Sequence, residues 1–415
     1  MSTGPWPIVP LRRIAEVIDC AHLTAPFVDE IQYPVVSIRE CASSTIDLTD
    51  CNHTTVEFFK LLRDSGRTPR VGDLVFIRNV SVGLVSVVTP ETPNFALGQE
   101  TVLIRQRAGS DPRFLRYSLT SHIATHAIES AMVGATFRRI NVSAIRSLPV
   151  PVPPPDEQHA IANFLDRETA QIDALVSKQE EFIEFLRERR RAAIEVAVSE
   201  VGTSGPRLKH IIRSVRQGWS PQCYSWPADG IDTWAILKAG AVNGGVFRPM
   251  ENKELPAEET PRPEAAVQCG DLIVSRANTR NLVGSAAVVE GNFPRLMLSD
   301  KLYAFTINED QALPQFVSAV LGSRKWRDLI EMQATGASSS MLNISQSDIV
   351  NLPMTLPPVD EQRRILTHLD AQTARIDILI AKAQEHIAFA KERRAALITA
   401  VVAGQLDVRT ARKAG

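Results

Sequence analysis

A long helical pattern occurs twice in this 415-residue chain, and the two copies align with each other without a gap. Glu157 and Glu361, in two copies of a Pro-Pro-x-Asp-Glu-Gln motif, are 204 positions apart. Arg189 and Arg393, near the two helix ends, are separated by the same number. Chance rarely preserves such a register along a whole pattern, so each copy predicts the same long helix.

Apolar residues in both copies recur at the steps that keep one stripe of a helix facing a partner. The prolines before each copy cannot extend a helix backwards, and Asp156 and Asp360 stand at the expected N-cap. The stripe is less apolar at His386 and Ala390, where we expect weaker pairing between the two helices. The members of the expected helix-pair or subunit interface are Ile161, Leu165, Ile172, Leu175, Phe182, Leu186, Ile365, Leu369, Ile376 and Leu379.

The length of each helix points to its partner. A helix of about 45 residues, at about 1.5 Å per residue, is roughly 65 to 70 Å long and cannot bury such a stripe on a small domain. The natural partner is the other copy, lying antiparallel because a globular segment separates the two. Periodicity alone fits equally well two long helices in an ordinary α-rich core.

The globular segments also repeat. Leu208-Lys209-His210-Ile211 echoes Leu11-Arg12-Arg13-Ile14, and Gly270-Asp271-Leu272 echoes Gly72-Asp73-Leu74. In the first segment we expect short strands, including residues 74–77, followed by one helix from Pro112 to Gly134. The predicted fold is therefore α+β, with two pseudo-repeated mixed domains separated by two long antiparallel coiled-coil helices. The predicted domain ranges are 1–150, 151–203, 204–354, 355–408 and a tail, 409–415.

A tandem duplication with an antiparallel helix pair has approximate two-fold symmetry, which suits a partner of similar symmetry such as duplex DNA. The net charge of −1 excludes a basic coat over the whole surface, so any DNA contact must come from local patches.

Polar, basic loops follow each Gly-Asp-Leu strand and each Gly-Ala step. Arginine and asparagine pair bidentately with guanine and adenine edges, and hydroxyls suit phosphate or base contacts. Any one such residue is equally well an ordinary solvated side chain, but matching places in both halves favour a shared role. The predicted DNA contacts are Arg78, Asn79, Ser81, Thr136, Arg138 and Arg139 in the first half, and Arg276, Asn278, Thr279, Arg280, Ser338, Ser339 and Ser340 in the second.

A basic cluster lies near the end of each helix. It is explained by the helix dipole, or by contact with DNA or an acidic subunit. Its members are Arg187, Arg189, Arg190 and Arg191, with Lys391, Arg393 and Arg394.

Signals for catalysis are absent from the sequence. The chain has no phosphate-binding loop, no dinucleotide fingerprint, and no Asn or Asp followed by Pro-Pro and an aromatic, as an amino-methylating site would show. His122 and His126 have zinc-ligand spacing, but Ile123 stands where the general base is required. We expect no catalytic residues on this chain.

Five widely spaced cysteines without a Cys-x-x-Cys pair predict neither a disulfide framework nor a metal site. No secretion signal or membrane span is expected, so the protein reads as cytoplasmic.

The chain closely resembles the specificity subunits of type I restriction-modification systems. The resemblance covers residues 10–408 and is carried by Gly-Asp-Leu-x-x-x-Arg in each half, the Gly-Ala-[Thr/Ser] step, the duplicated Pro-Pro-x-Asp-Glu-Gln helix start and the Glu-Arg-Arg helix ends.

The resemblance implies two target-recognition domains, each reading one half of a bipartite sequence in double-stranded DNA. The helix pair then sets the spacer and docks two methyltransferase subunits, and restriction subunits join the complex. No cofactor is expected on this chain; S-adenosylmethionine, ATP and Mg²⁺ are expected on the partner subunits.

Two other readings remain open. One is the recognition subunit of a related system in which methylation and cleavage reside in one partner. The other is a coiled-coil scaffold that never touches DNA, against which the matched basic loops speak.

Overall fold

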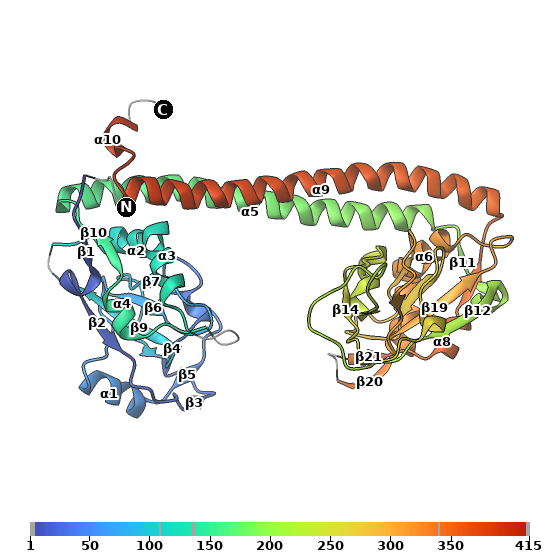
Figure 1. The fold of residues 1–415 in the computed structure, drawn as a ribbon, viewed down its shortest axis with the longest axis horizontal. Coiled ribbons are helices and arrows are strands. Elements are labelled where there is room, and N and C mark those ends of the chain that lie inside the picture. Colours follow the sequence, from blue (N-terminus) through green and yellow to red (C-terminus); the bar gives the residue numbers. More distant parts are fainter. Residues whose placement is uncertain (1–4, 108, 134–137, 339–340, 412–415) are drawn as a thin grey trace. The chain divides into compact units, whose positions relative to one another are not determined.

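The computed structural model describes residues 5–107, 109–133, 138–338 and 341–411 (Figure 1). The chain divides into two compact units, residues 1–180 with 384–415, and residues 181–383. Each long helix contributes to both units, so each unit contains a globular domain and part of each helix. The predicted ranges 151–203 and 355–408 each span both units, and the predicted domain limits stay predictions. Among the described residues, no helix is both long and apolar enough to cross a membrane.

The first unit begins with short strands and ends in helix. Its strands are β1 (Ile8–Pro10), β2 (Ala15–Asp19), β3 (Phe27–Val28), β4 (Tyr33–Val36), β5 (His53–Thr54), β6 (Leu74–Ile77), β7 (Val85–Val87), β8 (Ala96–Leu97), β9 (Thr101–Gln106) and β10 (Pro149–Pro151). Its helices are η1 (Leu11–Arg13), η2 (Arg39–Cys41), α1 (Val56–Asp64), α2 (Pro112–Thr120), α3 (His122–Ala131), α4 (Val142–Arg146), the first part of α5 (Pro155–Ala197) and α10 (Val408–Ala411).

The core of this unit lies on both faces of one antiparallel sheet, in the order β2-β9-β6-β7. Strand β6 is central and fully buried, because alternate side chains enter different clusters. Leu74 and Phe76 pack with the residues of α2 and α3, whereas Val75 and Ile77 face the cluster shared with the second sheet, β3-β5-β4-β8. This central strand therefore ends at a firmly held position, where Arg78 follows.

The second unit has the corresponding elements. Its strands are β11 (Gly202–Arg207), β12 (Ile212–Gln217), β13 (Ala235–Leu237), β14 (Asn252–Glu254), β15 (Leu272–Ser275), β16 (Ala277–Asn278), β17 (Ala286–Val288), β18 (Leu296–Met297), β19 (Leu302–Ile307), β20 (Thr335–Ser338), β21 (Met341–Asn343) and β22 (Pro353–Thr355). Its helices are η3 (Leu208–Ile211), η4 (Ala239–Gly245), η5 (Pro263–Ala265), α6 (Pro314–Gly322), α7 (Arg324–Gln333), α8 (Gln346–Val350) and part of α9 (Val359–Val402).

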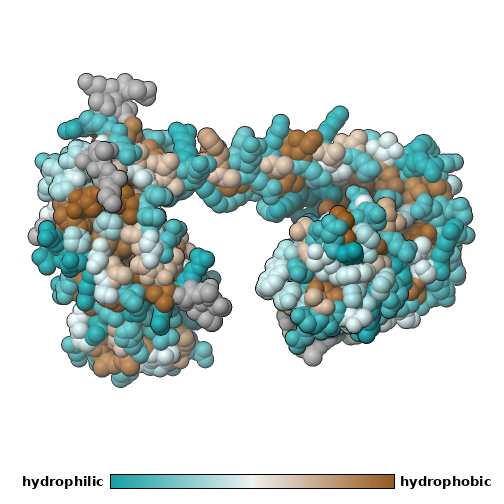
Figure 2. All heavy atoms as spheres, in the orientation of Figure 1, coloured by the Kyte–Doolittle hydropathy of each residue, from teal (hydrophilic) through white to brown (hydrophobic). Residues whose placement is uncertain are grey.

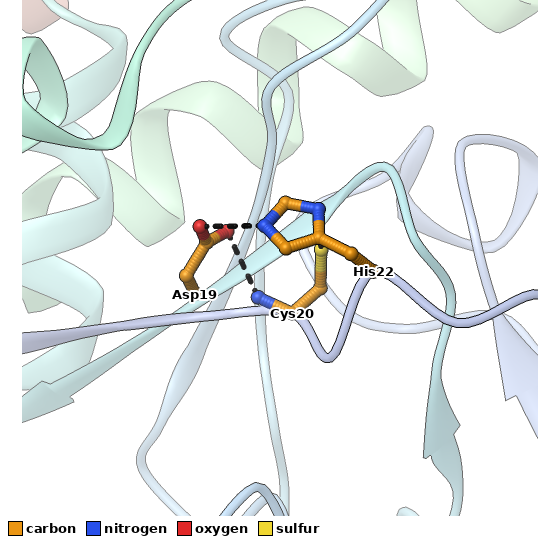
Figure 3. A group of neighbouring side chains, drawn as sticks. All are labelled: Asp19, Cys20 and His22. Carbon is orange, nitrogen blue, oxygen red and sulfur yellow. Dashed lines mark hydrogen bonds and ion pairs between the residues drawn. The ribbon is translucent and has the colours of Figure 1, made fainter.

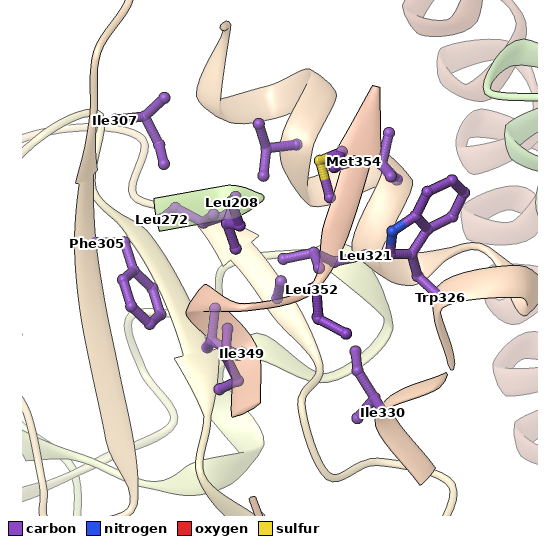
Figure 4. Close-up of a cluster of buried hydrophobic side chains, with 14 of the residues drawn as sticks. Leu208, Leu272, Phe305, Ile307, Leu321, Trp326, Ile330, Ile349, Leu352 and Met354 are labelled. Atoms are coloured by element: carbon purple, nitrogen blue, oxygen red, sulfur yellow. The ribbon is translucent and has the colours of Figure 1, made fainter. Parts of the chain in front are cut away.

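The duplication predicted from the sequence is confirmed by the topology. The sheet β12-β19-β15-β17 repeats the order β2-β9-β6-β7, and Leu272 lies opposite Phe305 as Leu74 lies opposite Ile104. Sheet residues and residues from α6, α7 and α8 share one buried cluster, which includes Trp326 and Ile349 (Figure 4). Each half thus builds the same layer of helices on the same sheet.

The long helices pair antiparallel, as predicted. In the first unit, Nε of Arg394 lies 2.8 Å from Oδ1 of Asp173, and Nζ of Lys391 lies 3.7 Å from Oε1 of Glu180. Residue numbers rise along α5 as they fall along α9. In the second unit, Nε of Arg190 lies 3.4 Å from Oδ1 of Asp377. Arg190 and Arg394 are 204 positions apart, as are the two aspartates, so one ion pair is made twice.

These ion pairs assign a role to part of the basic cluster at the helix ends. Arg190, Lys391 and Arg394 point to acidic residues of the other long helix. Pairing across the helices was not among the explanations expected from the sequence, and the helix dipole and contacts with DNA or an acidic subunit stay predictions.

Most of the expected apolar stripe is buried, but three of its members are not. Leu175, Phe182 and Leu379 are 50%, 40% and 42% exposed, and hydrophobic patches show along the helices in Figure 2. Ile183 is buried in place of its neighbour Phe182, because one residue is a 100° step around a helix. The three exposed residues therefore lie outside the helix pairing, while their role in a subunit interface stays a prediction. Those that are buried are Ile161, Leu165, Ile172, Leu186, Leu369 and Ile376, with Ile365 half-buried.

The expectation of weaker pairing between the two long helices near Ala390 was wrong. Ala383 and Ala390 are both buried, and the ion pairs of Lys391 and Arg394 lie alongside. Small side chains let two helices approach closely, so their low apolar content does not weaken the packing. His386, which interrupted the expected stripe, is exposed.

Two local expectations also need correction. The single helix expected from Pro112 to Gly134 is two helices, because Ser121 adopts an extended conformation with ψ of 159°. Helix α5 begins at Pro155 and α9 at Val359, so Asp156 and Asp360 lie in the first turns and are not the N-caps. There the carboxylates still favour the positive end of the helix dipole.

The glutamine of each Asp-Glu-Gln motif fastens the long helix to the globular domain. Oε1 of Gln158 accepts a hydrogen bond from the backbone N–H of Asp111 (3.1 Å), and its Nε2 donates to the Pro153 carbonyl (2.9 Å). Gln362 binds Leu313 and Pro357 in the same way, at 2.9 and 2.8 Å. Asp111 and Leu313 are the N-caps of α2 and α6. Both glutamines are buried, so each fixes the start of a long helix on its domain.

Replacing Gln362 with leucine should destabilise the second unit. The half-buried Leu313 N–H and Pro357 carbonyl would lose their partner, at a cost of up to about 1 to 3 kcal/mol for each unsatisfied group. Calorimetric unfolding of the full chain measures the loss. Gln384→Leu, at an exposed position of the same helix, is the matched control. Equal unfolding temperatures for the two variants would contradict the role of Gln362.

Candidate nucleic-acid interface

The two predicted contact segments of the first half lie side by side. The N–H of Val80 donates to the Arg138 carbonyl (2.9 Å), and the N–H of Ile140 donates to the Arg78 carbonyl (3.0 Å). An isolated antiparallel bridge joins Asn79 to Arg139. Sequence reasoning placed these segments in separate loops. The structure makes them one surface, with Arg138 and Arg139 exposed and Asn79 and Ser81 half-buried.

The second half builds the same arrangement as a small sheet, β16-β21-β20. The N–H of Ile344 donates to the Arg276 carbonyl (2.9 Å), as Ile140 does to Arg78. Asn278 pairs with Leu342 in β21, and β20 pairs with β21 as a hairpin. Thr279 and Arg280 follow at the exposed end of this sheet.

Several predicted contacts cannot be placed. Thr136, Ser339 and Ser340 lie outside the described residues, and Ser338 is described only as the backbone end of β20.

The central strand in each half is anchored by the aspartate of Gly-Asp-Leu. Asp73 is buried, accepts the N–H of Arg70 (2.9 Å) and is paired with Arg105 (2.8 Å). Asp271 likewise accepts the N–H of Gln268 and is paired with Arg216. The arginine comes from β9 in one half and from β12 in the other. The shared motif is therefore structural: it holds the strand whose end presents Arg78 or Arg276.

Arg78 does not extend freely from the first surface. Its Nη1 donates to Oδ1 of Asp19 (2.7 Å), and its side chain is only 14% exposed. Oδ2 of Asp19 also contacts Nε2 of His22 at 3.0 Å (Figure 3). Partial burial opposes the charged form of Asp19, but the Arg78 guanidinium and the hydrogen bonds from Arg78 and His22 together hold its pKa below its usual range.

Arg276 is held differently, by the Asp300 carbonyl (3.3 Å). Within the described part of the chain it has no ion pair with a carboxylate. Its positive charge is therefore not neutralised locally, whereas that of Arg78 is. The two halves share a backbone frame but present different charges on it.

Asp19, Cys20 and His22 are the group of potential metal ligands that the described residues bring within 4.8 Å of one another. Their geometry does not suit one ion. His22 turns Nδ1 toward Cys20 Sγ (3.6 Å) and Nε2 toward Asp19, and the lone pairs of these nitrogens diverge. Burial also raises the pKa of the Cys20 thiol, which donates to the Gln99 carbonyl, whereas a metal requires the thiolate.

Sequence reasoning missed Asp19, since it lies 59 positions from Arg78 and in no shared motif. It also missed the role of Gln158 and Gln362, although their recurrence in both helix motifs was visible. The repeat marked the residues as special, and only the fold shows which backbone groups they bind.

Comparisons with known proteins agree with this architecture. Residues 5–184 match the family model described as the type I restriction modification DNA specificity domain. The chain is 34% identical over 170 residues to the type I restriction enzyme EcoEI specificity subunit of Escherichia coli, covering 41% of this chain and 29% of that protein. It is 24% identical over 308 residues to the EcoKI specificity subunit of Escherichia coli K12, covering 71% and 65%. The chain thus spans less than two thirds of the length of either relative.

A solved structure reported for the assembly and conformational transition of a type I R-M system aligns with 97% of this chain and 99% of its own. The TM-score is 0.60 and the identity 18%, which indicates a shared fold.

Removing the acid beside Arg78 should loosen the first surface. In Asp19→Asn, we expect protection of the Val80 and Ile140 amides from hydrogen exchange to fall about tenfold, equivalent to about 1.4 kcal/mol. Asp29→Asn, an exposed acid on the same unit, is the control.

The pH dependence of that protection follows from the lowered pKa of Asp19. A carboxyl with a depressed folded pKa stabilises the fold above its ordinary value of 3.8 and loses that effect as pH falls through the lower folded value. Protection should hold from pH 7 to 5 and decline only below about pH 4. A decline already near pH 6 would assign the effect to another group.

Proposed function

We propose that this chain is the DNA-reading subunit of a type I restriction-modification complex and catalyses no reaction itself, because residues 5–184 match the type I restriction modification DNA specificity domain. Each globular domain then reads one half of a bipartite target. Its place in the cell is the cytoplasm, where DNA is accessible.

One observation carries this proposal: both halves join a loop after the central strand to a second polar segment by the same backbone hydrogen bond. Ile140 binds Arg78 and Ile344 binds Arg276. The exposed ends carry Arg138 and Arg139 in one half and Thr279 and Arg280 in the other. A common frame with different side chains suits two domains that read different base sequences.

The charge difference between the halves supports distinct reading modes. Arg276 has no carboxylate partner among the described residues and is a candidate for a bidentate contact with guanine. Arg78 is neutralised by Asp19, so we assign it to positioning the loop, with Arg138, Arg139 and Asn79 making the contacts. Thr136, Ser339 and Ser340 complete the two surfaces in this proposal.

The helix pair is proposed to set the spacer and to dock partner subunits. Leu175, Phe182 and Leu379 are large apolar side chains exposed on helices that are otherwise paired, and exposed apolar residues of this kind suit a protein partner. We propose two methyltransferase subunits there and restriction subunits in the larger complex. S-adenosylmethionine, ATP and Mg²⁺ would then be bound by the partners.

The function is tested by co-expressing this chain with its methyltransferase partner in a host without DNA methylation and mapping modified bases genome-wide. We expect a split motif of two defined halves around a fixed gap. A stable complex that leaves the genome unmodified would favour a scaffold that does not read DNA. The methyltransferase expressed alone is the control.

Lengthening both helices should change the gap without changing the halves. Four residues inserted after Lys178 and four after Lys382 keep the copies in register and add about 6 Å, or one to two base pairs at about 3.4 Å each. The same methylation map measures the result. Altered half-sites around an unchanged gap would mean that the helices do not act as a ruler.

A further inference from the structure

A basic hollow lies on the first unit, where β2 begins and β9 ends. Its volume is about 460 Å³, and it is lined by Arg12, Arg105, Arg107 and Arg146, with Glu16 and Gln106 among the remaining residues. Four arginines and one glutamate thus line a single space. We propose that this hollow binds a phosphate group.

Three of the four arginines are held in place before any ligand arrives. Nη1 of Arg12 donates to Oγ of Ser147 (3.0 Å), and Nη2 of Arg146 donates to the Val17 carbonyl (3.1 Å). Arg105 is fixed by Asp73. Each guanidinium has five N–H donors, so these contacts leave others for a ligand. Preorganised arginines are the side chains best matched to phosphate oxygens.

The fourth arginine, Arg107, differs from the other three in its contacts. Within the described part of the chain, the Arg107 side chain is exposed and makes no hydrogen bond or ion pair, while its backbone N–H is fixed on the Ile14 carbonyl (3.0 Å). The charge of Arg105 is balanced by Asp73, so Glu16 faces the three remaining positive charges. The hollow is therefore electropositive, and its size suits a phosphate with an attached group.

The hollow is separate from the recognition surface of the same domain. Strand β9 pairs with Ile77, next to Arg78, at its first residue, and with Ala15 at its last, Gln106. Five steps of about 3.4 Å put the two sites roughly 17 Å apart along this strand. A nucleic acid held at the recognition surface would reach the hollow only with its flanking backbone.

The second half does not repeat the site. The pairing of β9 and β19 with the central strands makes Arg105 equivalent to Thr306 and Arg107 equivalent to Asn308. There Arg213 donates to Asn308 and is paired with Asp310 (3.2 Å). A threonine and an asparagine occupy the places of two arginines, so the phosphate site belongs to the first half alone.

The test uses Arg107→Glu, since this side chain has no contact in the fold to lose. Arg13→Glu, an exposed neighbour of Arg12 outside the hollow, makes the same charge change. Arg12→Ala with Arg146→Ala is a second variant that removes donors without adding a negative charge.

The first measurement is calorimetric titration of the full chain with inorganic phosphate at constant ionic strength. We expect saturable binding that the hollow variants weaken at least tenfold and the control leaves unchanged. This arm does not depend on the proposed function.

The second measurement is affinity for duplex DNA at rising salt, with long and short flanks beyond the half-site. It rests on the proposed function. We expect the hollow variants to lower the slope of log affinity against log salt by about one, for one phosphate contact, on long flanks only.

The outcomes separate the sources of the phosphate. An effect on titration alone identifies a free phosphate compound, and an effect on the salt slope alone identifies the DNA backbone. Effects on both identify a backbone site that free phosphate also enters. If the hollow variants match Arg13→Glu in both measurements, the proposal is overturned, even where the methylation map supports DNA reading.

Discussion

The architecture depends on an ion pair that the duplication makes twice. Arg394 reaches Asp173 in one unit and Arg190 reaches Asp377 in the other, and corresponding partners are 204 positions apart. In each copy the arginine stands 17 positions after the aspartate. An insertion between them in one helix alone would shift the arginine away from its partner. This requirement explains why the helices align without a gap while the globular segments between them differ in length.

Much of the fold could be predicted because the residues that determine it recur in periodic, repeated patterns. The two helices, the duplicated sheet and the central Gly-Asp-Leu strands all came from residues that recur at fixed spacings. The errors occurred where two local choices were close in energy. Ser121 breaks a helix that its apolar pattern would continue, and Ile183 replaces its apolar neighbour Phe182 in the helix pairing.

The candidate site was predicted less completely. The structure joins the backbone segments that sequence reasoning selected through the carbonyls of Arg78 and Arg276. Sequence reasoning did not foresee that Arg78 is neutralised, because Asp19 is distant in sequence and the described residues of the second half show no equivalent ion pair. Contacts between side chains that are far apart in sequence produce no periodic pattern. The net charge of such a surface can therefore be read only from the folded structure.

The paired glutamines have a consequence for how such a chain changes over time. In the globular domains, Gln158 and Gln362 form hydrogen bonds only with backbone groups, among them the N–H groups of Asp111 and Leu313. A backbone N–H is the same whatever side chain it carries, and here the two residues are an acid and an apolar leucine. These hydrogen bonds therefore do not depend on the side chains of the domain, so the same helix start can hold domains of unrelated surface sequence. Whole domains can be exchanged between chains at this joint without redesigning the helix that receives them.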